Sequence, residues 1–149
     1  MAFWDISALV KLYVRERDSD RFREMVRASG GVPGISQLTL SEIHRALWAK
    51  EFVRTIPENR AESTYRKFRN DIEARSIEII PFAGDVQDKF DRILPMRYCT
   101  TPVVPIRALD GLLLASALIA RTQELVSTDS RLRAAGALFG LRVLPVQTE

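Results

Sequence analysis

Short apolar segments alternate with segments of helical period along the chain, and this alternation constrains the fold more than any other feature. Strands are expected at residues 3–4, 32–36, 77–80, 124–127 and 141–144. Helices are expected at residues 7–14, from a cap at Asp18 or Ser19 to Gly30, from about Thr39, from Pro57 to about Arg75, and at residues 85–94, 108–120 and 130–138. Residues 95–105 contain three prolines and are expected to form an irregular loop. Strands joined by helices form a parallel sheet covered on both faces. The sequence therefore predicts an α/β fold with three layers, α/β/α, around a central, mostly parallel sheet.

The size and composition predict one soluble globular domain over residues 1–149. Apolar residues make up 46% of the chain and charged residues 28%. The longest apolar stretch, residues 108–120, is too short to span a bilayer, and the N-terminus carries no basic leader. Cys99 is the single cysteine and cannot form an intrachain disulfide. We therefore expect a cytoplasmic protein without a membrane partner.

Arginine dominates the basic residues, with 18 arginines against 4 lysines and a net charge of +3. The planar guanidinium suits phosphate groups, which favours a polyanionic partner. The codon bias of a GC-rich genome explains the same excess equally well, so the charge alone decides little.

Four carboxylates, Asp5, Glu42, Asp110 and Asp129, stand where an apolar segment meets a helix or within an apolar helical run. Asp110 is the only charged residue in the stretch 108–120, and no lysine or arginine follows three or four positions later. Ligands bind open parallel sheets outside the carboxyl ends of the strands, where we expect all four side chains to converge. Like charges about 4 Å apart cost roughly 4 kcal/mol at an effective dielectric near 20. A hard divalent cation, Mg²⁺ or Mn²⁺, would relieve that repulsion. Without metal, neutralising Asp110 or Asp5 is expected to raise the melting temperature, because it removes like-charge repulsion.

Each carboxylate also has a purely structural explanation. Asp5 can cap the first helix, Glu42 completes a capping box that begins at Thr39, and Asp129 can cap the helix at Ser130. Asp110 could lie in an exposed first helical turn. The joint pattern is more informative than any one member.

In this order the four segments resemble PIN-domain nucleases, most closely the VapC-like toxins of type II toxin–antitoxin pairs. The first segment is Phe3-Trp-Asp-Ile-Ser-Ala-Leu, and the second is Ser36-Gln-Leu-Thr-Leu-Ser-Glu-Ile. The third is Arg107-Ala-Leu-Asp-Gly-Leu, and the fourth is Leu125-Val-Ser-Thr-Asp-Ser. The family often carries a histidine three positions after the third carboxylate, where this chain has Leu113.

The resemblance implies a PIN-like fold whose acidic cluster binds Mg²⁺ or Mn²⁺ and cleaves RNA. It implies that Asp5 and Asp110 are the principal metal ligands and catalytic residues, that Glu42 and Asp129 complete the site, and that Ser7 orients Asp5. Ser7 could equally be a helix cap. The implied partners are an RNA substrate, a cognate antitoxin protein and a second copy of the chain in a homodimer.

Two rival functions stay open. A non-catalytic module would use the same arginines to bind RNA or protein, and an aspartate-nucleophile phosphatase would need a second acid where Ser7 stands. Other polar residues receive structural interpretations: His44 at or near the surface, and Asp85, Asp88 and Asp91 on a solvated helix face. Trp48 and Phe52 could pack in the core or in an interface, the latter being preferred, and Arg107 could bind a substrate phosphate.

Overall fold

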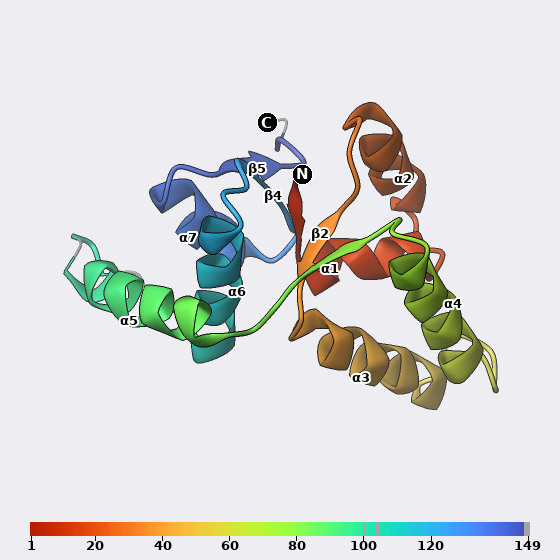
Figure 1. Cartoon of the computed structure of the whole chain (residues 1–149). Coiled ribbons are helices and arrows are strands. Elements are labelled where there is room, and N and C mark those ends of the chain that lie inside the picture. Colours follow the sequence, from red (N-terminus) through yellow and green to blue (C-terminus); the bar gives the residue numbers. More distant parts are fainter. Residues whose placement is uncertain (100, 104, 148–149) are drawn as a thin grey trace.

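The central layer is a five-stranded parallel sheet in the order β3-β2-β1-β4-β5. The coordinates are a computed structural model, and the structure describes residues 1–99, 101–103 and 105–147. The strands are β1 (Phe3–Trp4), β2 (Gly34–Ser36), β3 (Glu78–Ile80), β4 (Glu124–Val126) and β5 (Arg142–Leu144). The helices are α1 (Ile6–Leu9), the 3₁₀ turn η1 (Val10–Leu12), α2 (Ser19–Ala28), α3 (Thr39–Phe52), α4 (Ala61–Glu73), α5 (Gly84–Tyr98), α6 (Ala108–Ile119) and α7 (Ser130–Leu138). Helices α1 to α4 lie on one side of the sheet, and α5 to α7 lie on the other (Figure 1).

Adjacent strand residues feed two separate cores, as the pleat of a strand requires. Phe3 and Leu125 join the core formed with α5, α6 and α7. Trp4 and Val126 join the core formed with α1 to α4. The sheet is therefore buried on both faces, and the predicted α/β/α layering, with a parallel sheet, is confirmed.

The contact between α5 and α6 depends on Gly111, which directly follows one of the four carboxylates. A Cβ added at Gly111 would lie 2.5 Å from Cε2 of Phe90 on α5, well inside van der Waals contact. Only glycine lets the ring of Phe90 lie against the first turn of α6. This close packing helps to bury Asp110 where α6 begins.

Two predicted helix boundaries are wrong. Helix α4 begins at Ala61 and not at Pro57, because a carboxylate oxygen of Glu51 on α3 accepts the backbone N–H groups of Arg60 and Ala61, both at 2.8 Å. Helix α5 continues to Tyr98, so the first part of the predicted loop 95–105 is helical. Pro95 removes one backbone donor, yet the next turn still closes with the Cys99 N–H on the Pro95 carbonyl at 3.0 Å. Residues 100 and 104 of that predicted loop lie outside the described residues.

The predicted capping of α2 by Asp18 or Ser19 is also wrong. Helix α2 begins at Ser19 without a side-chain cap. The Asp18 carboxylate instead pairs with the Lys11 ammonium at 2.8 Å, and the Ser19 hydroxyl accepts the Glu16 N–H and donates to the Val14 carbonyl. Both side chains therefore serve the turn before α2.

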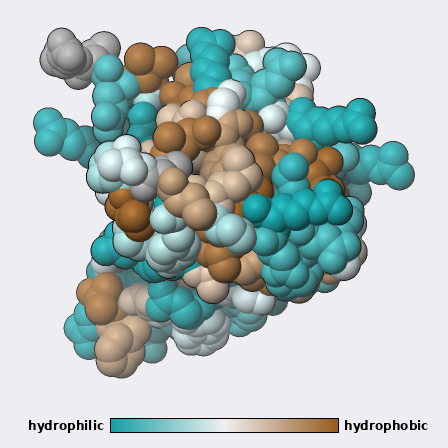
Figure 2. Space-filling model, turned by 90° about the vertical axis from the view of Figure 1, so that its left-hand side faces the viewer, coloured by the Kyte–Doolittle hydropathy of each residue, from teal (hydrophilic) through white to brown (hydrophobic). Residues whose placement is uncertain are grey.

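Within the described part of the chain, no helix is both long enough and apolar enough to cross a membrane. The side of the molecule where α5, α6 and α7 lie carries apolar surface bordered by hydrophilic side chains (Figure 2). Large apolar side chains exposed on these helices include Met96, Leu109 and Leu138.

Candidate functional site

All four predicted carboxylates line one cavity of about 370 Å³. Asp5 directly follows β1, Glu42 lies in the first turn of α3, Asp110 in the first turn of α6, and Asp129 directly before α7. The other lining residues are Ile6, Ser7, Arg107 and Leu109. The parallel pairing of β1 with β2 and β4 brings the segments that follow these strands to one edge of the sheet. The sequence-based expectation that the four side chains converge at this edge is confirmed.

Asp5 is nearly buried, with 4% of its surface exposed, and one of its oxygens is held by two serines. Its Oδ2 accepts hydrogen bonds from Ser7 Oγ at 2.6 Å, from Ser127 Oγ at 3.0 Å and from the Ser7 backbone N–H at 3.3 Å. Burial raises the pKa of the Asp5 carboxyl, while these hydrogen bonds lower it in part. The Ser7 N–H bond makes Asp5 the N-cap of α1, so its structural explanation holds together with its place in the cavity.

Ser127 is a site residue that the sequence reasoning missed. It is fully buried at the end of β4, and besides binding Asp5 its Oγ accepts the Asp129 N–H at 3.1 Å. The Thr128 N–H donates to Ser7 Oγ at 2.9 Å. These bonds tie the chain after β1 to the chain after β4. The available signal was the segment Ser127-Thr-Asp129, from which only the carboxylate had been selected.

Glu42 shares the cavity with the negatively charged side chains of Asp5 and Asp110. The pKa of its carboxyl is raised to about 7, mainly by burial and in smaller part by the charges of Asp5 and Asp110. A long hydrogen bond from Thr39 Oγ1, at 3.4 Å, and the charge of Arg45 act in the opposite direction. The capping box considered for Thr39 and Glu42 is not formed, because the N-cap of α3 is Leu38, whose side chain has no acceptor. The Glu42 carboxylate is therefore not used to start α3.

Asp110 and Asp129 share a cation, Arg107. Arg107 Nε donates to Asp110 Oδ2 at 2.7 Å, and Nη2 lies 3.3 Å from Asp110 Oδ1 and 3.5 Å from Asp129 Oδ2. Arg107 stands three residues before Asp110, a spacing that allows a same-face ion pair, whereas the sequence-based expectation concerned only the positions after Asp110. Asp110 therefore has a basic partner, which the absence of lysine and arginine at the positions after it did not reveal. The predicted role of Arg107 in binding a substrate phosphate stays a prediction.

Asp129 also performs its alternative, structural role. Its Oδ1 accepts the backbone N–H groups of Arg131 and Leu132 at 2.9 and 3.0 Å, which caps α7. Its Oδ2 is the oxygen that approaches Arg107. One oxygen thus fixes the helix while the other belongs to the cavity.

The donor chemistry of the cavity fits a hard divalent cation, since it consists of carboxylates whose mutual repulsion is visible at Glu42. Their present arrangement is not a finished metal site. Among residues 1–99, 101–103 and 105–147, no three histidine, cysteine, aspartate or glutamate side chains are placed so that they could hold one ion. The guanidinium of Arg107 lies against two of the four carboxylates.

The residues that received structural interpretations lie away from this cavity. The His44 ring stacks on Tyr65, with ring centroids 3.8 Å apart, and its Nε2 lies 2.9 Å from Glu62 Oε1. The solvated face of α5 is confirmed, because Asp85, Asp88 and Asp91 are exposed. None of these side chains lines the acidic cavity.

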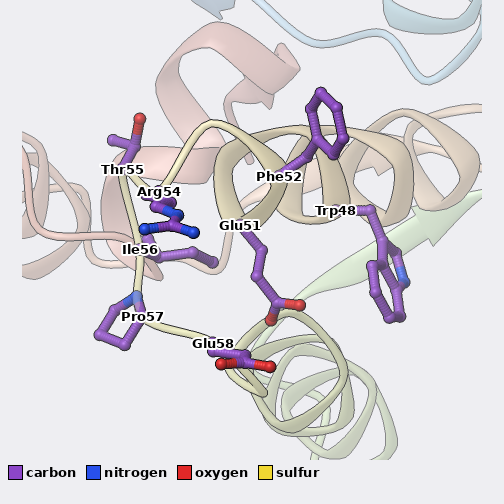
Figure 3. A pocket seen from close by; sticks show the side chains of 8 residues that line it. All are labelled: Trp48, Glu51, Phe52, Arg54, Thr55, Ile56, Pro57 and Glu58. Carbon is purple, nitrogen blue, oxygen red and sulfur yellow. The ribbon is translucent and has the colours of Figure 1, made fainter.

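Trp48 and Phe52 are not core residues: they are 47% and 88% exposed. They line a second, larger pocket of about 660 Å³ at the end of α3 and in the loop that leads to α4 (Figure 3). Trp48 Nε1 donates to Glu62 Oε1 at 3.0 Å, which fixes the indole on α3 against α4. The core alternative for these two aromatics is excluded.

The fold, but not the sequence, matches solved proteins. No protein-family model and no curated protein matches this chain. Among solved structures, FitAcB from Neisseria gonorrhoeae superposes with a TM-score of 0.64 at 15% identity, covering 97% of each chain. VapC20 from Mycobacterium tuberculosis, a sarcin–ricin loop cleaving toxin, gives 0.64 at 14% identity over 91% of this chain and 95% of its own. VapBC2 from Rickettsia felis, solved with a promoter DNA fragment, gives 0.63 at 16% identity over 95% and 96%.

These likenesses define the class of the fold. The chain has the PIN-like α/β/α fold, and the resemblance to VapC-type toxins stated from the motifs is confirmed at the level of the fold. At identities of 14–16%, activity and partners do not follow from the superposition.

Proposed function

We propose that this chain is a metal-dependent endoribonuclease and the toxin of a toxin–antitoxin pair. The observation that carries the proposal is the convergence of Asp5, Glu42, Asp110 and Asp129 in one cavity. The four come from distant parts of the chain. One oxygen of Asp5 is held by serine hydroxyl groups, and one oxygen of Asp129 is held by a backbone N–H group. The PIN-like fold shared with a toxin that cleaves the sarcin–ricin loop supports the choice of RNA as substrate.

In this proposal Asp5 and Asp110 are the principal ligands of Mg²⁺ or Mn²⁺, and Glu42 and Asp129 complete the site. Both principal ligands are nearly buried, at 4% and 5% exposed, so their positions are well fixed. Ser7 and Ser127 hold Oδ2 of Asp5, which leaves Oδ1 for the cation. The carboxylates of Glu42 and Asp129 are partly open to solvent and can act directly or through water.

The chemistry is hydrolysis of an RNA phosphodiester. A bound divalent cation would polarise the phosphodiester and lower the pKa of a coordinated water. The four carboxylates would bind the cation. Arginines outside the cavity would contact the phosphate groups of the RNA backbone. In-line attack of water on phosphorus would break the P–O3′ bond, which leaves 5′-phosphate and 3′-hydroxyl ends.

The experiment that tests this proposal measures cleavage of a structured RNA by purified protein in Mg²⁺ or Mn²⁺ and in EDTA. We expect cleavage that requires the metal and falls by about a hundredfold or more in Asp5→Asn, because a metal contributes several kcal/mol to the transition state. Asp88→Asn, at an exposed position of α5, is the matched control and should cleave like wild type. Equal cleavage by Asp5→Asn and wild type would refute the assignment.

A non-catalytic RNA-binding module is the second candidate, and one observation favours it. Arg107 already pairs with Asp110 and Asp129 and compensates part of their charge, so a metal is not the only cation that can stabilise them. Such a module would bind RNA with strong salt dependence and cleave it under no divalent cation. The cleavage assay therefore separates the two candidates.

The proposed antitoxin would cover the exposed aromatic side chains Trp48 and Phe52. Exposed aromatic side chains of this kind are typical of protein interfaces. Solved structures with a similar fold include a toxin–antitoxin complex from Klebsiella pneumoniae and VapBC2 from Rickettsia felis, which supports a protein partner. Phe52→Ser should weaken co-purification with the co-expressed product of a neighbouring reading frame and leave RNA cleavage unchanged. Phe82→Ser, at a 39% exposed phenylalanine outside this pocket, is the control, and equal loss in both variants would contradict the assignment.

We also propose a homodimer. The apolar surface formed on the α5–α7 side is the candidate contact (Figure 2). Light scattering of Leu138→Glu against wild type tests it: the variant should shift toward monomer, and an unchanged mass would exclude this surface.

A further inference from the structure

We propose that Arg107 is an internal counter-ion of the acidic cavity, which a divalent cation must displace in order to bind. The guanidinium then compensates part of the charge of Asp110 and Asp129 only while the metal is absent. The inference rests on the proposed metal binding and adds to it a competitor supplied by the chain itself.

The geometry of the ion pair is two-pronged. Nε and Nη2 of Arg107 approach the two carboxylate oxygens of Asp110 at 2.7 and 3.3 Å, which is the arrangement in which guanidinium and carboxylate interact best. Nη2 also lies 3.5 Å from Oδ2 of Asp129. One side chain thus contacts both carboxylates on its side of the cavity.

A metal would need the same oxygens. Both oxygens of Asp110 face the guanidinium, and Oδ1 of Asp129 is committed to the N–H groups at the start of α7. The one remaining oxygen, Oδ2 of Asp129, also lies beside Arg107. Metal and guanidinium therefore compete for the same ligands, which explains why the described carboxylates do not already form a group that could hold an ion.

The side chain of Arg107 can move away from the cavity, whereas that of Asp110 is buried and fixed. The Arg107 side chain is 57% exposed, while that of Asp110 is 7% exposed. Arg107 occupies the N-cap position of α6 with extended backbone, so a rotation of the side chain moves the guanidinium into solvent without disturbing the helix. The carboxylates stay in place while the cation on them is exchanged.

The test compares Mn²⁺ affinity, by calorimetric titration, in wild type, Arg107→Gln and the control Arg69→Gln. Arg69 is exposed on α4, so its loss changes the net charge equally but not the cavity. We expect Arg107→Gln to bind Mn²⁺ about three- to tenfold more tightly than wild type, and Arg69→Gln to match wild type. Binding by wild type with equal or weaker binding by Arg107→Gln overturns this inference alone. Absence of binding in both proteins overturns the proposed function as well.

The second readout is the melting temperature, which requires no activity. In EDTA, Arg107→Gln should melt below wild type, because Asp110 and Asp129 lose their cation, and Mn²⁺ should raise its melting temperature by more than it raises that of wild type. Arg107→Lys keeps the charge without the fork and should lie between the two, which also covers the case of a poorly folded Gln variant. Equal melting temperatures and equal responses to Mn²⁺ in all three proteins would contradict the exchange.

Discussion

The carboxylates in the two halves of the acidic cavity, Asp110 with Asp129 and Asp5 with Glu42, are stabilised in different ways. Asp110 and Asp129 share the guanidinium of Arg107. Among the described residues, no ion pair joins Asp5 or Glu42 to a basic side chain; Asp5 relies on hydrogen bonds from Ser7 and Ser127, and Glu42 on one long bond from Thr39. Burial therefore raises the pKa of both carboxyls in this second half.

This difference determines in which half of the cavity a bound cation would be stabilised most. On the Asp5–Glu42 side an incoming ion meets charge that is not compensated, whereas on the Asp110–Asp129 side it must first remove a cation. The hydroxyl groups of Ser7 and Ser127 stabilise Asp5 by hydrogen bonds and leave its other oxygen available to a cation. Arg107, in contrast, contacts both oxygens of Asp110. In the proposed metal-bound state, the Asp5–Glu42 half would gain a cation, whereas the Asp110–Asp129 half would exchange Arg107 for one.

The largest expected effect is the loss of cleavage on removal of a carboxylate from the arginine-bound half. Asp110→Asn should reduce metal-dependent RNA cleavage by about a hundredfold or more, since it removes a principal ligand. It should also lower the melting temperature in EDTA, because Arg107 loses its main partner. The latter reverses the expectation from sequence alone, that neutralising Asp110 stabilises the metal-free protein. Thermal melts of Asp110→Asn and Asp88→Asn in EDTA decide between the two, and a raised melting temperature in Asp110→Asn alone would restore the sequence-based view.

A smaller effect is expected from the hydrogen-bonded half. Ser127→Ala removes one donor to Asp5 and the acceptor of the Asp129 N–H, and it should lower the cleavage rate about ten- to a hundredfold, as loss of a residue that orients a metal ligand does. Ser116→Ala is the matched control: that serine is equally buried, but its Oγ donates to the Leu112 carbonyl within α6. Equal losses in both variants would mean that Ser127 acts only through stability.

The smallest effect concerns folding stability and its dependence on pH. The Glu42 carboxyl has its pKa raised from 4.5 to about 7, so the folded protein retains this proton over a range where the unfolded chain has lost it. In EDTA this group therefore makes stability fall as pH rises from about 4.5 to about 7, by about 1–2 kcal/mol once solvent screening of this partly exposed group is allowed for. Glu42→Gln should gain that amount over wild type at pH 8 and nothing at pH 4.

Chemical denaturation of wild type, Glu42→Gln and Glu58→Gln at both pH values measures this gain. Glu58 is exposed in the loop before α4 and serves as the charge-matched control. A Glu42→Gln variant that is less stable than wild type at pH 8 would show that the carboxylate supports the fold.

The carboxylates could be predicted from sequence because each lies beside a signal that also determines the fold. Asp5 follows an apolar strand, and Asp110 interrupts an apolar helix, so the elements and the site are found together. Ser127 lies in the same motif segment as Asp129 but does not by itself indicate a strand or a helix, since a serine at the end of a strand is common and neutral. Arg107 precedes Asp110 by three residues, a spacing that allows an ion pair. The sequence-based expectation took only the positions after Asp110 as possible partners and therefore missed it.

Most helices and strands followed from periodicity, whereas their ends depended on contacts from elsewhere. The start of α4 is set by Glu51, which lies on another helix and reaches across to the N–H groups of Arg60 and Ala61. The end of α5 passes Pro95, because packing against α6 outweighs one missing hydrogen bond. Such contacts join residues whose proximity only the folded chain creates.

The most direct measurement of the central claim is an anomalous difference map from crystals grown without metal and then soaked in Mn²⁺. We predict a strong peak in the cavity between the carboxylates of Asp5, Glu42 and Asp110, with the guanidinium of Arg107 moved away from Asp110. A cavity that shows no peak at saturating Mn²⁺, with Arg107 still on Asp110 and Asp129, would contradict the account.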